Sequence, residues 1–205
     1  ARATALRKMI ATGQFSDIQK VMPKSSYALL ADELRKGHYV LDLSKFQKEI
    51  IYNLRKMSVE EIAQLVDVSE GLENAIKNAA NSSNNLVDFV NIVKSKRYTQ
   101  TRIQRILIYA LLGITNSKML AFKKAVPYAR VLGFNENGKQ LISQIAKKNK
   151  KVQIVTSVKK YMDESKNKVL KEMLETDILA TNVYTLGYEK DSWSNLDYTN
   201  KLVTM

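Results

Sequence analysis

The sequence predicts a mostly α-helical protein: a multi-helix domain with one small two-stranded parallel βαβ unit. Apolar residues recur every three or four positions along most of the chain, which is the spacing of a single helix face. Only seven glycines and two prolines punctuate 205 residues, so loops are few or short. Two segments depart from the helical spacing, Tyr128–Phe134 and Val152–Val155, and both are short and rich in β-branched or aromatic residues.

The first half is expected to be helical throughout. Pro23 stops one short helix, Gly37 ends the next, and Ser44 can cap the one after it. Ser58–Glu61 has the pattern of a capping box, in which a serine hydroxyl and a glutamate carboxylate satisfy free backbone N–H groups at a helix start. The polar run Asn81–Asn85 separates the last two of these helices, which are expected at residues 1–11, 15–22, 25–36, 44–54, 58–66, 72–80 and 86–93.

The second half contains the most apolar helix. Thr99 or Thr101 can cap it, and its apolar residues repeat at three and four positions from residue 102 to 114. A shorter helix at 116–124 ends before Pro127, and a helix at 138–148 joins the two strand-like segments. Helices at 163–174 and 177–186 close the domain, and the polar, weakly patterned residues 191–205 are expected to form a surface tail.

Composition excludes several classes of protein and site. The chain lacks cysteine, which excludes a disulfide scaffold, a thiol nucleophile and a cysteine-ligated zinc site. Its single histidine, His38, follows Gly37 at a helix end; the sequence shows no evident acid partner for a triad and no second histidine for a metal site. No apolar run approaches the ~18 residues that a membrane span needs. We therefore expect no catalytic residue, no metal and no membrane partner.

Charge is unevenly distributed. Residues 89–162 contain 16 Lys and Arg but one acidic residue, Glu136, whereas the whole chain has a net charge of +13. Unmixed charge repels itself, so a bound polyanion is the best explanation for such a segment. Chance combined with general solubility is the alternative. An anionic membrane surface is disfavoured because the single tryptophan, Trp193, lies outside the segment.

The sharpest candidate site is the segment from Lys94 to Arg105. Its hydroxyls and the free N–H groups of the helix that it opens can hold a phosphate, Tyr98 can stack on an unpaired base, and two arginine forks share one helix face. Arg102 and Arg105 are expected to be exposed, and the other face of the helix is expected to be buried through Ile103, Ile106, Leu107, Ala110 and Leu111. The alternative is a capped core helix whose arginines pair with the acidic C-terminal segment. We predict that nucleic acid is bound by Lys94, Lys96, Arg97, Tyr98, Thr99, Thr101, Arg102, Arg105, Lys123, Lys124, Arg130, Lys147, Lys148, Lys150 and Lys151.

Three segments resemble one known family. Tyr98–Arg105, Tyr128–Phe134 with Gly138, and Asp177–Tyr184 look like the C-terminal region of bacterial tRNA(Met) cytidine acetate ligase, a nucleotidyltransferase-like family of the HIGH-motif superfamily. Ala3–Arg7 also looks like the element that closes nucleotidyltransferase domains.

The resemblance implies a function. Members of this family activate acetate with ATP and transfer the acetyl group to N4 of the wobble cytidine of elongator tRNA(Met), in the cytoplasm. Their N-terminal nucleotidyltransferase domain has a His-x-Gly-His-type motif, which this chain lacks. Residues 1–22 are accordingly interpreted as the end of that domain, residues 23–190 as a helical tRNA-binding domain and residues 191–205 as a tail. Arg7 matches the arginine that lies near the ATP phosphates in the family.

The chain alone is therefore expected to be inactive and to hold neither ATP nor acetate tightly, because the missing domain supplies the adenylation site. The main alternative is a helical DNA-binding module that uses residues 99–114 as its recognition helix. A complete small enzyme is disfavoured by the missing catalytic groups. A protein-interaction scaffold would leave the basic segment unexplained.

Overall fold

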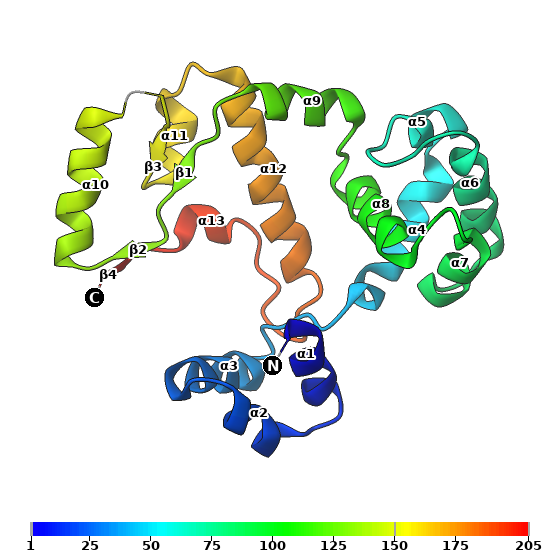
Figure 1. Cartoon of the computed structure of the whole chain (residues 1–205), viewed down its shortest axis with the longest axis horizontal. Helices are drawn as coiled ribbons and strands as arrows, with labels where there is room; N and C mark the ends of the chain where they lie inside the picture. The colour runs from blue at the N-terminus through cyan, green and yellow to red at the C-terminus, as the bar shows by residue number, and fades with distance from the viewer. Residues whose placement is uncertain (1, 150, 205) are drawn as a thin grey trace. The chain divides into compact units, whose positions relative to one another are not determined.

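The computed structural model describes residues 2–149 and 151–204, and it is mostly helical (Figure 1). The helices are α1 (Ala3–Ala11), α2 (Phe15–Val21), α3 (Lys24–Lys36), α4 (Gln47–Lys56), α5 (Val59–Ala63), α6 (Leu72–Ser82), α7 (Leu86–Val93), α8 (Gln100–Leu112), α9 (Asn116–Lys124), α10 (Glu136–Lys148), α11 (Val158–Glu164), α12 (Lys168–Thr185) and α13 (Leu196–Thr199), with a 3-10 turn at Leu43–Phe46. The strands are β1 (Ala129–Arg130), β2 (Gly133–Phe134), β3 (Ile154–Val155) and β4 (Val203–Thr204). The predicted mostly helical class is confirmed. None of the described helices is long and apolar enough to cross a membrane.

The chain divides into two compact units. The first contains the chain up to Phe46 together with Val183–Ser194, and the second contains Gln47–Asn182 and the segment that begins at Asn195. This division differs from the expected one, which placed boundaries after residues 22 and 190. The functional meaning given to residues 1–22, 23–190 and 191–205 stays a prediction.

The first unit brings α3 to a segment more than a hundred residues away in sequence. Gly37 ends α3 in the left-handed conformation, and its carbonyl accepts a hydrogen bond from Glu189 N at 2.9 Å. Gly187 lies against Phe46 and Val40, where an added Cβ would approach side-chain carbons to 2.8 Å. Only glycine fits there without movement of that apolar contact.

The larger core of the second unit lies among α4 to α8. Their apolar faces supply most of its fully buried side chains, including Ile50, Leu54, Ile76, Ile106 and Leu107. The predicted capping box is present, because Ser58 accepts from Glu61 N and the Glu61 carboxylate accepts from Ser58 N. Basic side chains also cap helices here. The Lys77 ammonium donates to the carbonyls of Leu54, Arg55 and Met57 at the end of α4.

The predicted βαβ unit is confirmed and a second strand pair accompanies it. β1 pairs in parallel with β3, and α10 lies between them in sequence. β2 pairs in parallel with β4, so the expected single strand at 128–134 is in fact two short strands. At Gly133 an added Cβ would lie 2.7 Å from the carbonyl oxygen of Val203, so the close approach of β4 requires glycine.

One expectation for the C-terminal part was wrong. Residues 163–174 and 177–186 are not separate helices: α12 runs without a break from Lys168 to Thr185, because no breaker separates its apolar residues. The expected surface tail at 191–205 is mostly exposed over its described residues, and α13 and β4 form within it. Pairing with β2 stabilises β4. Neither the length nor the composition of β4 indicates this pairing. Leu174 and Ile178 of α12 pack with Val155 and Val158 in a second, smaller core.

Candidate nucleic-acid interface

The two arginines at the start of α8 bind the loop that precedes α6. Arg102 donates to the Asp67 carbonyl oxygen from Nε at 2.9 Å and from a terminal nitrogen at 2.7 Å, and it reaches Ser69 Oγ at 2.9 Å. Arg105 donates from Nε and a terminal nitrogen to Asp67 Oδ2, both at 2.9 Å. Asp67 and Glu70 have positive φ angles of 68° and 44°, so the loop is held in a conformation that ordinary residues seldom adopt. The arginines stabilise this conformation by satisfying its carbonyl and carboxylate.

Tyr98 and Arg97 complete the same arrangement, which we call the arginine clasp (Arg97, Tyr98, Arg102 and Arg105 on residues 67–71). Arg97 forms an ion pair with Glu70. The Arg97 and Arg102 guanidinium carbons lie 5.6 and 5.2 Å from the centroid of the Tyr98 ring, within cation–π range. The ring already contacts two guanidinium groups, so it is less available to stack on a base than the sequence indicates.

The structure corrects the expected surroundings of these arginines. Sequence spacing predicts that Arg102 and Arg105 are both exposed, but Arg102 is half-buried. The alternative of a core helix places the acidic partners of these arginines in the C-terminal segment, whereas the observed partner of both is Asp67. The expected buried face of α8 is confirmed for Ile103, Ile106, Leu107 and Ala110. Leu111, also expected to be buried, is only partly so.

The threonines act as local caps. Thr99 is the N-cap of α8 and its hydroxyl accepts from Arg102 N at 3.4 Å. The Thr101 hydroxyl lies 3.2 Å from that of Thr99. These contacts fit the predicted capping role, and both side chains are exposed.

Arg130 is also engaged within the chain. It forms an ion pair with Asp197 of α13, and only 25% of its side chain and 9% of the Asp197 side chain are exposed. Nearby, Tyr128 donates a hydrogen bond to Asp177, which joins the second and third of the resembling segments. Burial, followed by this bond to Asp177, raises the pKa of Tyr128 well above its usual value. Tyr128, Arg130 and Asp177 of these two segments therefore stabilise the fold of the second unit.

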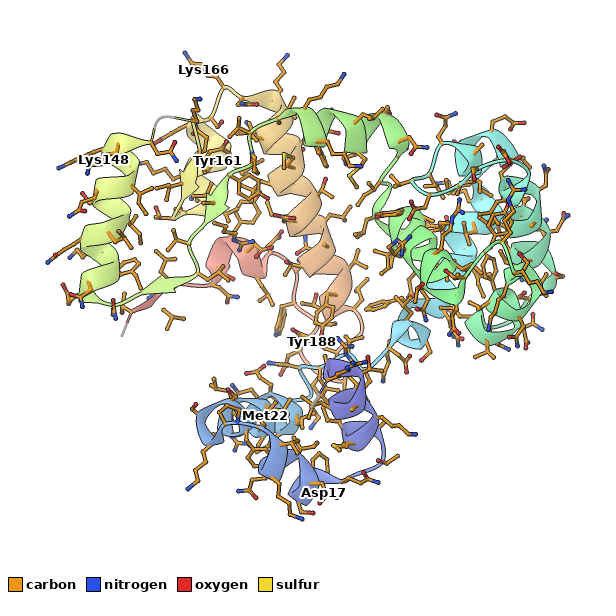
Figure 2. The ribbon with its side chains drawn as sticks, viewed as in Figure 1. Asp17, Met22, Lys148, Tyr161, Lys166 and Tyr188 are labelled. Carbon is orange, nitrogen blue, oxygen red and sulfur yellow. The ribbon has the colours of Figure 1, made fainter. Side chains whose placement is uncertain are left out.

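The lysines differ from the arginines. Seven of the predicted lysines are exposed and form no ion pair with any described residue: Lys94, Lys96, Lys123, Lys124, Lys147, Lys148 and Lys151. Figure 2 shows Lys148 extending away from α10. Lys150 lies outside the described residues. Surface ammonium groups with no acidic neighbour can pair with the phosphates of a polyanion, so these side chains form the strongest candidate interface.

Two further candidates lie in the first unit. Arg7 is exposed on α1 and has no ion pair within the described part of the chain, so nothing there opposes a role toward phosphate. His38 stacks on Tyr188 at 5.1 Å, and its Nδ1 lies 3.3 Å from a Glu33 carboxylate oxygen. This packing agrees with a structural histidine.

Among residues 2–149 and 151–204, no group of three or more His, Cys, Asp or Glu side chains could hold a metal ion.

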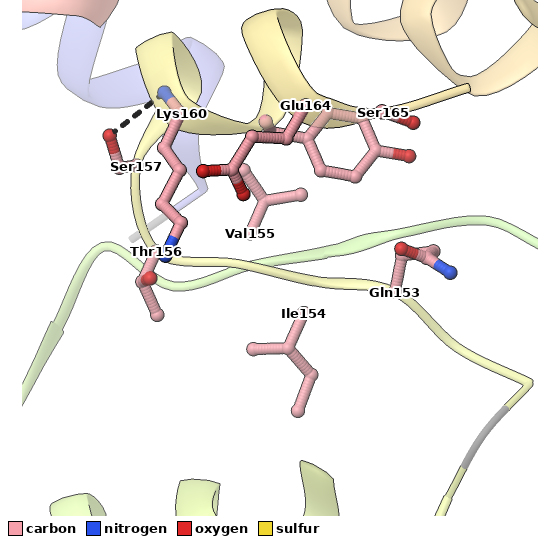
Figure 3. A pocket seen from close by; sticks show the side chains of 9 residues that line it. Gln153, Ile154, Val155, Thr156, Ser157, Lys160, Glu164 and Ser165 are labelled. Carbon is pink, nitrogen blue, oxygen red and sulfur yellow. Dashed lines mark hydrogen bonds between the residues drawn. The ribbon is translucent and has the colours of Figure 1, made fainter. Parts of the chain in front are cut away.

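A small cavity of about 370 Å³ lies beside β3 and α11. Figure 3 shows Lys160 and Glu164 extending from α11 along it, while Gln153 and Ile154 line it from the β3 segment. Its charged groups are the Lys160 amine and the Glu164 carboxylate, and the Ser157 hydroxyl already accepts a hydrogen bond as the N-cap of α11. Its lining does not match any of the predicted site residues.

Comparison with known proteins shows the family to which the chain belongs. A family model described as HIGH Nucleotidyl Transferase matches residues 1–198. The chain belongs to the HIGH nucleotidyl transferase family. The match takes in nearly the whole chain and is not limited to residues 1–22 or to a C-terminal part of it.

Three similar proteins carry the name tRNA(Met) cytidine acetate ligase. The chain is 37% identical over 205 residues to tRNA(Met) cytidine acetate ligase of Thermoanaerobacter pseudethanolicus, with 100% of this chain and 49% of the relative covered. It is 36% identical to the Acetivibrio thermocellus protein of the same name (99% and 50% covered) and 33% identical to that of Listeria monocytogenes (97% and 46%). The chain thus spans about half the length of these relatives.

The fold also matches solved structures. A crystal structure of Thermotoga maritima TmcAL bound with alpha-thio ATP superposes with a TM-score of 0.91 at 23% identity, covering 100% of this chain and 52% of that chain. An apo crystal form of the same protein gives 0.90 at 22% identity, with 98% and 50% covered. At this level of identity the likeness shows a shared fold.

Sequence reasoning missed the acidic partners Asp67, Glu70 and Asp197. Each lies outside the basic segment, at a separation of 27 to 67 residues from the arginine that it binds. One local signal was available for the first two: Asp67–Gly71 is a short, turn-forming stretch between two helix patterns. Nothing local signals that Asp197 faces Arg130.

Proposed function

We propose that this chain is the helical, tRNA-binding part of an ATP-dependent tRNA(Met) cytidine acetate ligase, which forms N4-acetylcytidine at the wobble position. One observation carries the proposal: a similarity of 33–37% identity to three such ligases that extends over nearly the whole chain. The seven unpaired lysines support it, because an RNA backbone is the polyanion that an enzyme of this kind binds.

In this proposal the lysines and the arginines of the basic segment have different roles. The exposed lysines bind phosphates and supply most of the affinity by releasing counterions. The arginine clasp orders residues 67–71 and the start of α8, next to Lys94 and Lys96 in sequence. Arg97, Arg102 and Arg105 therefore contribute through the fold, and contribute to RNA directly only where a guanidinium N–H remains free.

Acetate activation belongs to the other half of the enzyme in this proposal. The chain has no His-x-Gly-His motif and a single histidine packed on Tyr188, so it does not form the adenylation site by itself. Residues 1–22 then represent the end of the adenylation domain, residues 23–190 the tRNA-binding part, and residues 191–205 the closing segment. Arg7 is the position proposed to approach ATP phosphates, and elongator tRNA(Met) in the cytoplasm is the proposed partner.

A gel-shift series tests the RNA-binding proposal. Binding of elongator tRNA(Met), other tRNAs and duplex DNA is compared at several salt concentrations, and tRNA affinity should fall steeply as salt rises. The double variant Lys147→Ala/Lys148→Ala should weaken tRNA binding and lower the salt slope by about one for each phosphate that the lysines neutralise. Lys48→Ala/Lys56→Ala is the matched control, since both lysines are exposed on α4 outside the basic segment.

Four results would contradict the proposal. Affinity that hardly changes with salt, or falls equally in both double variants, would remove the electrostatic interface. Stronger binding of duplex DNA than of tRNA would favour the DNA-binding alternative, although α8 buries one face in the core and its first turn is bound by the arginine clasp. ATP–pyrophosphate exchange dependent on acetate, measured with the chain alone, should be absent, and its detection would show that the adenylation site lies here.

A further inference from the structure

A second cavity, of about 630 Å³, lies at the carboxyl ends of β1 and β3 in the second unit. Val131 and Leu132 follow β1 along one side of it, Thr156 and Ser157 follow β3 on another, and the segment from α13 to β4 closes it. In sheets with parallel strands, ligands bind preferentially beyond the carboxyl ends of the strands. The volume lies within the range typical of small-molecule sites.

One end of this cavity holds a buried donor–acceptor pair. Arg130 donates to Asp197 Oδ1, and the other carboxylate oxygen, Oδ2, is buried without a hydrogen bond from any described residue. A buried carboxylate oxygen normally has a donor, so this one has an unmet requirement. Rotation about the last torsion of an aspartate is soft, which allows the carboxylate to turn an oxygen toward a ligand in the cavity.

The remaining lining is suited to a flat, partly apolar ligand that carries negative charge. Tyr198 is an aromatic side chain with 40% of its surface exposed, and Leu132 and Val203 are more exposed still. Lys201 adds an ammonium group that forms no ion pair within residues 2–149 and 151–204. An aromatic face, a hydrogen-bonding pair and a separate amine correspond to the base, base edge and phosphate of a nucleotide.

We propose that this cavity binds the unpaired base of an adenine or cytosine nucleotide. The base stacks on Tyr198, its exocyclic amino group donates to Asp197, its neighbouring ring nitrogen accepts from Arg130, and Lys201 contacts its phosphate. Uracil presents the opposite order, a carbonyl beside a ring N–H, and so places an acceptor against the carboxylate. The assignment of the nucleotide to an RNA rests on the proposed function.

Base preference tests the proposal. Single-stranded RNA hexamers of A, C or U are titrated by fluorescence anisotropy at fixed low salt, and AMP, CMP and UMP are titrated by ligand-observed NMR. The unmodified chain should bind A and C hexamers roughly three- to tenfold more tightly than U hexamers, as expected for a difference of one hydrogen bond. Equal affinity for all three bases in both assays would overturn the proposal.

Asp197→Asn gives the sharper readout. Its amide oxygen can still accept from Arg130, but its amide nitrogen then offers a donor where the carboxylate offered an acceptor. The preference should therefore shift toward U, which loss of structure alone would not produce. Asp163→Asn, at an exposed position of α11, is the matched control and should leave the preference unchanged.

Tyr198→Leu covers the case in which Asp197→Asn fails to fold. It leaves the Arg130–Asp197 pair intact and should weaken binding of all hexamers by roughly tenfold because the base loses its stacking partner. Tyr52→Leu, at an exposed position of α4, is the control and should leave binding unchanged. Unchanged binding in Tyr198→Leu would overturn the proposal. A base preference seen with mononucleotides but not with RNA hexamers would support the cavity and contradict the proposed RNA-binding function. Salt-dependent RNA binding without any base preference would support the RNA-binding function and contradict the cavity.

Discussion

The two basic regions of the second unit use their charges differently. At the start of α8 the arginines are bound to Asp67, Ser69 and Glu70 of the same chain. From α9 to the segment after α10, the exposed lysines form no ion pair with a described residue, whereas the half-buried Lys118 pairs with Glu172. The difference follows from the side chains: a planar guanidinium with several donors organises a loop, whereas an ammonium on a flexible stem stays hydrated.

This comparison shows that a run of basic residues can have a structural part and a binding part. Both parts lie within residues 89–162, which looks uniform in sequence. The three predictions that follow would sharpen or break the division between them.

The largest effect is expected in the core beneath the arginine clasp. Leu107 is 1% exposed, and Leu107→Ala should lower the free energy of unfolding by about 2–5 kcal/mol through reduced burial and the cavity left behind. Chemical denaturation measures this change. Leu120→Ala on α9, where the leucine is 57% exposed, is the control and should cost far less.

A smaller but measurable loss of stability is expected from the clasp itself. Arg102→Ala leaves the Asp67 carbonyl and Ser69 without their donor, and should lower the free energy of unfolding by about 1–3 kcal/mol. Arg105→Ala should cost less because that ion pair is more exposed. Lys147→Ala/Lys148→Ala should stay within about 0.5 kcal/mol of the unmodified chain.

Thermal and denaturant unfolding of these variants, measured beside their tRNA affinity, decides between the two roles. If Arg102→Ala keeps full stability while losing tRNA affinity, the clasp would be a binding site and the division between arginines and lysines would fail.

The smallest effect concerns Tyr128 and high pH. Burial and the bond to Asp177 raise its pKa in the folded chain, so the folded state retains this proton after the unfolded chain, with a tyrosine pKa of about 10, has lost it. The stability contributed by this group is complete below about pH 10 and declines as pH rises above that value. Tyr128→Phe should therefore show a shallower loss of stability above about pH 10 than the unmodified chain. Equal slopes in urea denaturation would show that Tyr128 is not responsible.

Much of the fold was predictable because its signals are local. The capping box at Ser58, the αL end at Gly37 and the apolar face of α8 all depend on residues within a few positions of one another. The β1–α10–β3 unit was predictable because its three segments are consecutive. The single α12 helix was not, since short polar interruptions look like boundaries when the packing of Leu170, Leu174 and Ile178 is unknown.

The candidate site was predictable only as a composition. The sequence by itself determined the concentration of basic residues in 89–162, the absence of catalytic cysteine and histidine constellations, and the resemblance to a ligase family. Tertiary structure decided which cations are free, because Asp67, Glu70 and Asp197 reach their arginines across 27 to 67 residues. It also decided that residues between Asp197 and Val203 form a wall of a cavity, because β4 needs the hydrogen-bonding edge of β2 and a segment's own residues do not specify a distant partner.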